Sequence, residues 1–284
     1  MEEAIKKADV LIEALPYIKA FHRKITVIKY GGSILGEDRV RKGVLEDIVF
    51  LSYMGLRPVL VHGGGPNISD RMRKTGKKTD FVDGMRVTDK ETLAIVEEEL
   101  EELNKKIIKE IEALGGKAKG YTADKNCILM ADKKKSKPDL GFVGKAVKLD
   151  AEVLMKDISS HVIPVISPMG KDANGVKYNI NADEAASFIA SVLGAIKFVL
   201  LTNVKGVMRD TSDSNSFLAS IKENEAKKLI KDKVIQTGMI PKIEACFHAI
   251  DGGVKKAHII DARIPHALLL EIFTDKGIGT EIAK

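Results

Sequence analysis

The stretch VLVHGGGPNISD, residues 59–70, ends an apolar run with a histidine and three consecutive glycines, and a proline follows them. Glycine tolerates a positive φ and lets another group approach the backbone closely, although ordering it costs conformational entropy. Three glycines in a row, Gly63, Gly64 and Gly65, therefore predict a sharp turn at which unshielded backbone N–H groups lie close to another group. We expect His62 to shape this turn rather than to transfer a proton.

On both sides of this turn, β-branched apolar runs alternate with amphipathic helical patterns. Residues 25–30 (ITVIKY) and 57–63 (RPVLVHG) are predicted strands, with a helix around 39–54 between them. Further predicted strands are 161–170, 197–208, 255–263 and 277–283, with weaker candidates at 117–122, 127–132 and 144–150 in a β-hairpin region; further predicted helices are 89–114, 183–195, 223–232, 265–273 and the segment after 242. This alternation predicts an α/β protein with a largely parallel sheet and right-handed crossovers.

Three parts of the chain are expected. Residues 1–24 carry apolar side chains at helical spacing, and Pro16 should kink this helix or split it. Residues 25–172 form a first lobe and residues 173–284 a second, because the polar, glycine-bearing stretch at 170–177 suggests a boundary.

The composition excludes several classes of protein. The net charge is +6, from 46 Lys and Arg against 40 Asp and Glu, and it suits small anionic substrates. The densest cluster of lysines, residues 132–138, is short and ends at a proline, so we interpret it as a solvated loop rather than an arm that binds nucleic acid. The two cysteines are isolated, which argues against a metal site or a disulfide framework. The acidic, charge-punctuated N-terminus does not resemble a signal peptide, and we predict a cytoplasmic protein.

Glycines follow two of the predicted strands at the edge of the sheet where ligands bind in open parallel folds. KYGGS (29–33) contains Lys29, Gly31 and Gly32, and HGGGP (62–66) follows the next strand. Such turns predict a cradle of N–H donors for phosphate. The known phosphate-loop patterns are absent, and Ile68 stands where a dinucleotide fingerprint needs its last glycine.

A cluster of charged residues is expected beside this cradle. Asp183 follows Asn179 and Asn181 at a predicted helix start, where it could serve only as an N-cap. Lys242 lies near another helix start, where the helix dipole disfavours a cation, so a purely structural role is less natural. If Lys29 and Lys242 converge, Asp183 is the candidate to hold them.

Eight motifs in series resemble the amino acid kinase family, nearly end to end and in the same order. They are KYGGS, HGGGP, DGMRVTD (83–89), DLGFVGK (139–145), YNINADEAA (178–186), LTNVKGV (201–207), GMIPKIEA (238–245) and LLLEIFTDKGIGT (268–280). The resemblance implies a three-layer α/β/α sandwich around a mainly parallel sheet. It further implies phosphoryl transfer from ATP to the side-chain carboxylate of N-acetyl-L-glutamate, a step of arginine biosynthesis, with Mg²⁺ carried by the nucleotide.

The resemblance also implies roles for residues at matching positions. Lys29 and Lys242 would flank the transferring phosphoryl group, with Asp183 orienting both. Arg86 and Asn179 would hold the α-carboxylate end of the substrate, because a planar guanidinium suits a carboxylate. The N–H groups of Gly31, Gly32, Gly63, Gly64 and Gly65 would face the phosphates or the acyl substrate, and Thr202, Asn203 and the segment before and at Gly238 would line the nucleotide.

The N-terminal helix, with the pattern Tyr17, Ile18 and Phe21, resembles that of family members which form hexamers, as trimers of dimers, and are inhibited by arginine. The matching effector residues would be Tyr17, Lys205, His258, Glu271 and Gly277. The alternative is that this helix packs only on its own subunit. Two positions depart from the family pattern: Ala123 and Ala262 stand where glycine is common.

Other functions remain open at this point. Another kinase of the family, such as glutamate 5-kinase, is disfavoured by DGMRVTD, and a catalytically silent amino-acid sensor is disfavoured because Lys29, Asp183 and Lys242 are all retained. An RNA-binding protein fits poorly with 5% aromatic residues and no Trp, and a dehydrogenase lacks its fingerprint.

Overall fold

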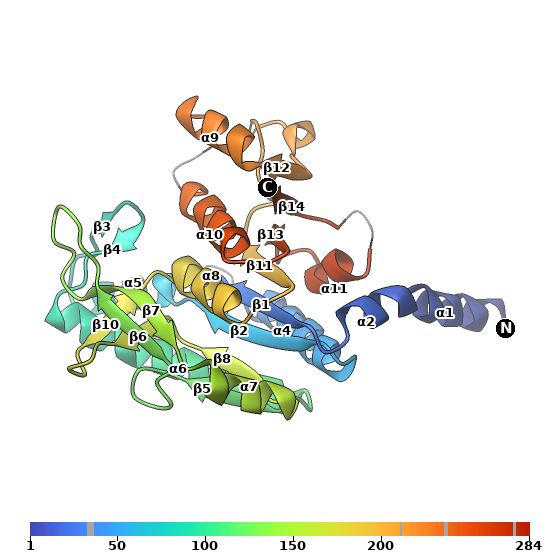
Figure 1. Cartoon of the computed structure of the whole chain (residues 1–284), viewed down its shortest axis with the longest axis horizontal. Helices are drawn as coiled ribbons and strands as arrows, with labels where there is room; N and C mark the ends of the chain where they lie inside the picture. Colours follow the sequence, from blue (N-terminus) through green and yellow to red (C-terminus); the bar gives the residue numbers. More distant parts are fainter. Residues whose placement is uncertain (33–36, 211, 236–237, 275–276) are drawn as a thin grey trace.

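A central sheet of eight strands organises the computed structural model, which describes residues 1–32, 37–210, 212–235, 238–274 and 277–284 (Figure 1). The strands are β1 (Ile25–Tyr30), β2 (Arg57–His62), β5 (Ala118–Tyr121), β8 (Ile163–Ile166), β11 (Lys197–Thr202), β12 (Ser220–Lys222), β13 (Lys256–Asp261) and β14 (Thr280–Ala283). Their order is β12-β14-β13-β11-β1-β2-β8-β5, and among these strands only the β13–β14 pair is antiparallel.

Helices cover both faces of this sheet. One face is covered by α4 (Asp38–Tyr53), α6 (Lys90–Ala113) and α11 (Ala267–Ile272), and the other by α7 (Ala151–Ser159), α8 (Ala182–Val192) and α10 (Ile240–Asp251). Neighbouring residues of β1 enter different cores: Val27 packs with the α8 and α10 side, and Ile28 with the α4 and α6 side. A strand buried on both faces is a continuous apolar run, which is the pattern from which the sequence predicted a parallel sheet. The prediction of a three-layer α/β fold is confirmed.

A small closed barrel packs beside the central sheet. It consists of β6 (Leu129–Lys133), β7 (Val143–Leu149), β9 (Met169–Lys171) and β10 (Lys177–Ile180). The predicted hairpin is present as β6 and β7, but the single strand predicted at 161–170 is wrong. Pro168, which lacks an N–H, separates β8 from β9 at a turn closed by a 2.9 Å bond from Met169 N–H to Ser167. The lobe boundary predicted after residue 172 falls between β9 and β10, which pair with each other.

The N-terminal helix is split as predicted, into α1 (Glu2–Glu13) and α2 (Leu15–Phe21). Pro16 lies in the first turn of α2, where its missing N–H removes no helical bond. Figure 1 shows α1 extending away from the rest of the chain. The remaining elements are α5 (Gly65–Lys74), β3 (Phe81–Val82), β4 (Met85–Arg86), η1 (Ser214–Ser216) and α9 (Glu223–Lys231).

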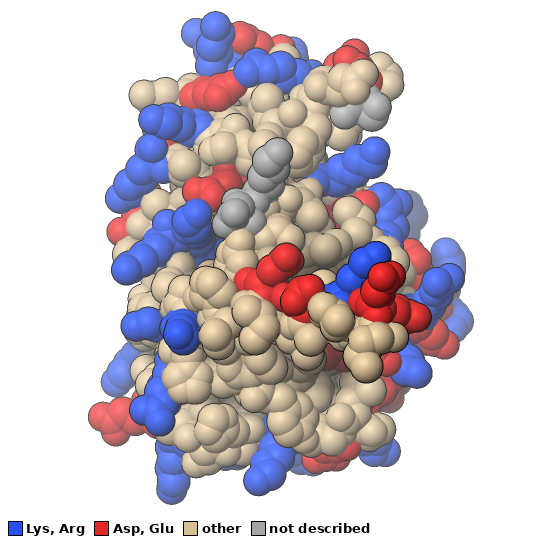
Figure 2. Space-filling view, turned by 90° about the vertical axis from the view of Figure 1, so that its right-hand side faces the viewer, with Lys and Arg blue, Asp and Glu red and all other residues tan. Residues whose placement is uncertain are grey.

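The charges on the surface are dispersed. On the face drawn in Figure 2, Lys and Arg are scattered around the rim rather than gathered into one stripe. In the basic stretch 132–138, Lys133 pairs with Asp139 at 2.8 Å and Lys134 with Glu184 at 2.6 Å. Within the described parts of the chain, no helix combines the length and apolar character needed to cross a membrane.

Candidate active site

Two glycine-rich turns lie side by side where β1 and β2 end. Gly63 N–H donates to the Tyr30 carbonyl at 2.9 Å. A Cβ on Gly32 would lie 2.9 Å from the nitrogen of Gly65 and 3.2 Å from that of Gly64, so the close approach needs glycine. Among the described residues, the N–H groups of Gly64 and Gly65 have no hydrogen-bond partner. The sequence predicted this pair of turns, and the second one leads directly into α5.

Three charged side chains meet beside these turns. Lys29 Nζ forms an ion pair with Asp183 Oδ1 at 2.7 Å, and Asp183 Oδ2 accepts a hydrogen bond from Lys242 Nζ at 3.0 Å. Lys29 is the penultimate residue of β1, Asp183 lies in the first turn of α8, and Lys242 lies in the first turn of α10. The predicted convergence of the two lysines on Asp183 is therefore present.

Asp183 is not the N-cap of its helix. That role belongs to Asn181, whose side chain accepts from the N–H groups of Asp183 at 2.9 Å and Glu184 at 3.1 Å. Because Asn181 caps α8, the carboxylate of Asp183 is free for the two lysines. The alternative that Asp183 serves only as a cap is excluded.

Burial and charge compete within this cluster. Burial raises the pKa of Asp183, but the neighbouring charges of Lys29 and Lys242 outweigh it and hold the pKa at about 2. Burial lowers the pKa of Lys29; the carboxylate of Asp183 opposes this effect and Lys242 adds to it. The Lys242 side chain is 24% exposed against 8% for Lys29, so it is the more accessible of the two cations.

A cavity of about 210 Å³ opens between the lysine–aspartate cluster and Arg86. Its walls include Lys29, Arg86, Asn179 and the glycines at 32 and 63–65. The Asn179 amide, on β10, donates to Thr88 Oγ1 at 3.2 Å. The cavity thus has one cationic group in Lys29, which is paired with Asp183, and another in Arg86, so it suits a small molecule with two anionic groups.

Arg86 is locked in place by its surroundings. Its guanidinium donates to the Gly65 carbonyl at 2.9 Å, to Ser69 Oγ at 2.8 Å and to Met72 Sδ at 3.1 Å, and it lies 4.7 Å from the centroid of the Phe81 ring. Burial lowers the pKa of this arginine. Within the described part of the chain it makes three bonds, fewer than its five N–H donors, so donors remain for a carboxylate.

A second cavity, of about 340 Å³, follows the carboxyl end of β11. Its walls are mostly apolar, with Val204, Val207 and Met239 among them, and the polar residues Asn203 and Lys205 also line it. Thr202 does not face it: its hydroxyl bonds to Val204 N–H at 3.1 Å and so closes the turn. Gly238 precedes α10, whereas residues 236–237 before it, and Ser33 of the first motif, lie outside the described residues.

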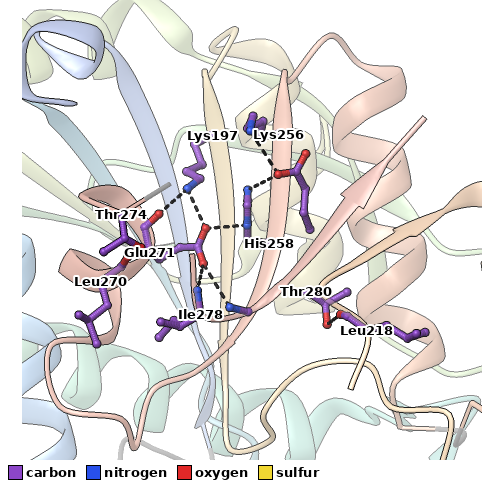
Figure 3. A network of polar contacts seen from close by, with 11 residues as sticks. Lys197, Leu218, Lys256, His258, Leu270, Glu271, Thr274, Ile278 and Thr280 are labelled. Atoms are coloured by element: carbon purple, nitrogen blue, oxygen red, sulfur yellow. Dashed lines mark hydrogen bonds and ion pairs between the residues drawn. The ribbon is translucent and has the colours of Figure 1, made fainter. Parts of the chain in front are cut away.

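Two of the predicted effector residues, His258 and Gly277, lie against a third, Glu271. Figure 3 shows His258 and Glu271 in contact. Glu271 Oε1 accepts His258 Nδ1 at 2.7 Å, and its Oε2 accepts the N–H groups of Ile278 at 3.0 Å and Gly279 at 3.3 Å. Gly277 has φ +60°, and a Cβ there would lie 2.7 Å from Oε2. Burial raises the pKa of Glu271, but His258 and Lys197 outweigh it and hold the pKa at about 2.

The lysine of this cluster is Lys197 rather than Lys205. Lys197 Nζ lies 2.9 Å from Glu271 Oε1 (Figure 3). The same atom lies 5.9 Å from the centroid of the Phe21 ring on α2. Lys205 lies beyond the opposite end of the same strand, at the second cavity. The signal in the sequence was a lysine opening the apolar run KFVLL, since a buried charge needs a partner.

Tyr17 lies near this cluster through an aromatic contact. Its ring packs edge-on against Phe273, with centroids 6.4 Å apart, just after α11. The N-terminal helix therefore packs on the element that carries Glu271.

Comparisons with known proteins agree with this geometry. A model of the amino acid kinase family matches residues 24–261. An acetylglutamate kinase of Petrotoga mobilis is 49% identical over 283 residues, which covers 99% of this chain and 95% of that protein. One from Methanocaldococcus jannaschii is 45% identical over 295 residues, covering 100% of this chain and 98% of that protein.

Solved structures share the architecture. An N-acetylglutamate synthase from Neisseria gonorrhoeae, complexed with coenzyme A and N-acetyl-glutamate, superposes with a TM-score of 0.88 at 25% identity, covering 98% of this chain and 63% of that chain. A carbamate kinase from Giardia has a TM-score of 0.67 at 17% identity, covering 92% of this chain and 99% of that chain, which is a likeness of fold alone.

Proposed function

The chain belongs to the amino acid kinase family, and from that membership we propose that its lysine–aspartate cluster performs phosphoryl transfer from ATP to N-acetyl-L-glutamate. The protein is a kinase that phosphorylates N-acetylglutamate. Curated relatives that are 43–49% identical over nearly their full length are named acetylglutamate kinase. The observation that carries the assignment of the site is the pairing of Lys29 and Lys242 on one carboxylate, at the edge of a cavity that ends at Arg86.

The reaction requires that the two anionic substrates be positioned together and that the negative charge on the transferring group be neutralised. The acceptor carboxylate is ionised near pH 7, so no general base is required. Lys29 and Lys242 lie on either side of the transferring phosphoryl group and offset its negative charge, while Asp183 keeps both ammonium groups in place. The free N–H groups of Gly64 and Gly65 add donors that need no reorganisation during the reaction.

The substrate lies along the smaller cavity. Its α-carboxylate binds the guanidinium of Arg86, and the amide of Asn179 bonds to the same end. The side-chain carboxylate then points to Lys29 and the glycine turns. The larger, mainly apolar cavity beside Asn203 and Lys205 takes the adenosine part of ATP. Mg²⁺ bound to the nucleotide would neutralise phosphate charge, and we assign it no protein ligand because Asp183 is held by the two lysines.

Arginine is the proposed effector, and the cluster of Lys197, His258 and Glu271 beside α2 is its proposed site. A buried carboxylate attracts a guanidinium or an α-amino group. The proposed assembly is a hexamer, a trimer of dimers, in which N-terminal helices meet. On α1 the apolar side chains Val10, Leu11 and Ile12 are more than 60% exposed, so they are available to a second copy. Deleting residues 1–21 should then abolish arginine inhibition and lower the mass measured by light scattering.

The first test is an ADP-release assay with Mg-ATP that compares N-acetyl-L-glutamate with free L-glutamate, each with and without arginine. Turnover of the acetylated substrate alone, inhibited by arginine, is the expected result. Turnover without inhibition would remove the effector assignment, and preference for free glutamate would indicate a different kinase of the family. Absence of turnover with either would indicate a sensor. The cytoplasmic location remains a prediction from the sequence.

A further inference from the structure

The histidine of the second glycine turn, His62, is fully buried and has no part in the mechanism above. It is the last residue of β2, and its ring reaches two polar groups. Nδ1 lies 3.1 Å from the carbonyl oxygen of Gly63, and Nε2 lies 3.1 Å from the amide nitrogen of Asn104 on α6. A buried polar ring with both nitrogens engaged is held in one orientation.

These two partners determine where the proton lies on the ring. The Gly63 carbonyl can only accept a hydrogen bond, so Nδ1 of His62 carries a proton and donates it. The Asn104 amide donates to Nε2 and also, at 2.9 Å, to the Val165 carbonyl. Burial lowers the pKa of His62 to about 4, so the ring is neutral near pH 7 and Nε2 can accept.

Asn104 is held as firmly as the histidine. It is 2% exposed, and a Cβ on Gly120 of β5 would lie only 2.2 Å from its Oδ1. Glycine at position 120 therefore leaves the space that the Asn104 amide occupies. The sequence showed neither Asn104 nor Gly120 as a functional candidate, because the relation to His62 exists only across three elements of the fold.

The hydrogen bond from His62 sets the direction of one peptide group. Within the described residues, Lys137–Pro138 is the cis bond, so the peptide between Gly63 and Gly64 is trans and its C=O and N–H point in opposite directions. With the Gly63 carbonyl drawn toward the imidazole, the Gly64 N–H points the other way. It faces Gly32 and the cavity, where no described group accepts it.

We propose that His62 is a positioning residue for phosphoryl transfer: by donating from Nδ1 to the Gly63 carbonyl, it aims the Gly64 N–H at the negative charge on the transferring group. The inference rests on the proposed function of the site. A preorganised N–H donor acts mainly on the transition state, so its misalignment lowers kcat more than it raises KM.

Two substitutions separate the donor to Gly63 from the contact with Asn104. In His62→Asn the short side-chain amide can still donate where Nδ1 did. In His62→Gln the longer amide reaches toward Asn104 and leaves the Gly63 carbonyl without its donor. We expect His62→Gln to lower kcat at least about tenfold with KM for both substrates within about threefold, and His62→Asn to keep kcat within about threefold of the parent.

Parental kcat in His62→Gln, equal losses in both variants, or a loss confined to KM would each overturn the positioning role. Melting temperatures of both variants, measured alongside, separate loss of fold from loss of alignment. If His62→Gln fails to fold, ¹⁵N NMR of the histidine ring in the parent protein decides: a proton on Nδ1 is expected, and a proton on Nε2 alone or a charged ring near pH 7 contradicts the inference. Failure of the proposed function would appear differently, as absent turnover in the parent protein, and would leave the NMR result unchanged.

Discussion

Lys29, at the end of β1, and Asp183, in the first turn of α8, form a 2.7 Å ion pair that is almost wholly shielded from solvent. The second oxygen of the same carboxylate binds Lys242, which is more exposed. One buried anion thus holds two cations that would otherwise repel each other, next to a cavity lined by glycine turns. Because desolvated charges interact strongly, each member of this triad should be sensitive to substitution.

Lys242→Ala should lower kcat about a hundredfold or more, the scale seen when one preorganised charge-stabilising donor is removed. The measurement is steady-state ADP release at saturating Mg-ATP and N-acetyl-L-glutamate. Lys227→Ala on α9, whose side chain is 70% exposed, is the matched control and should behave like the parent. Near-parental kcat in Lys242→Ala would remove this lysine from the mechanism.

Asp183→Asn should lower kcat by more than about a hundredfold, since the two ammonium groups lose the charge that holds them. The pKa of Lys29 should fall further, because burial and Lys242 both lower it and the opposing carboxylate is gone. As the pH rises, Lys29 should therefore lose its proton, and the residual activity should be lost, at a lower pH than in the parent. A kcat profile between about pH 6 and about pH 9 would measure this shift.

Asp150→Asn is the control for this variant, because Asp150 caps α7 and takes no part in the ion-pair cluster. Its kcat profile should match that of the parent. An Asp183→Asn protein that keeps both its turnover and its pH profile would contradict the assignment.

Arg86→Lys should raise KM for N-acetyl-L-glutamate by about tenfold or more and leave KM for ATP nearly unchanged. A lysine cannot reproduce the bonds to Gly65 and Ser69 while still presenting a planar fork to a carboxylate. Initial rates at varied concentrations of each substrate provide the test. Arg73→Lys on α5, at a side chain 79% exposed, should change neither constant. Equal effects on both substrates would place Arg86 outside the acyl-substrate site.

As the pH falls, the free energy of unfolding should decrease first because of His62, and only at lower pH because of the carboxylates. The folded-state pKa of His62 is about 4 against an ordinary value of 6.5, so between these values the unfolded chain binds more protons. Stability is therefore lost as the pH falls from about 6.5 toward about 4, by up to roughly 3 kcal/mol. Asp183 and Glu271, each with a pKa of about 2, add their losses as the pH falls below their ordinary values toward 2.

Urea titrations across this pH range would measure the effect. His62→Asn, which has no ring to protonate, should show a flatter dependence between about pH 6.5 and about pH 4. The same slope in the parent and in His62→Asn would show that this histidine does not govern the acid response.

Glu271→Gln should raise the arginine concentration for half inhibition by about tenfold or more, because a charge-assisted contact contributes about 1.5 to 3 kcal/mol. Turnover without arginine should change far less, since Glu271 is bound to Lys197 at the start of β11, whereas Lys29 meets Asp183 near the carboxyl end of the neighbouring β1. Glu225→Gln, at a partly exposed residue paired with Arg209, is the control. Unchanged inhibition in Glu271→Gln would move the effector site elsewhere.

Much of the fold follows from local patterns in the sequence. The apolar runs at 25–30, 57–62 and 197–202 are buried on both faces of the sheet, and such runs alternating with amphipathic helices leave little choice of architecture. The local prediction failed at 161–170, where Pro168 divides the strand and β9 turns into the small barrel. Closure of that barrel depends on pairing between β6, β7, β9 and β10, which no single stretch encodes.

The sequence by itself determined the chemical groups available: two lysines, one aspartate, an arginine and two glycine turns at the ends of predicted strands. Register and burial, which arise only when distant elements pack, decided the rest. They assigned the helix cap to Asn181 and freed Asp183, made Lys197 rather than Lys205 the partner of Glu271, and placed Asn104 against His62. A buried polar group takes whichever partner the fold brings within hydrogen-bond distance, so its role follows from tertiary contacts rather than from its neighbours in the chain.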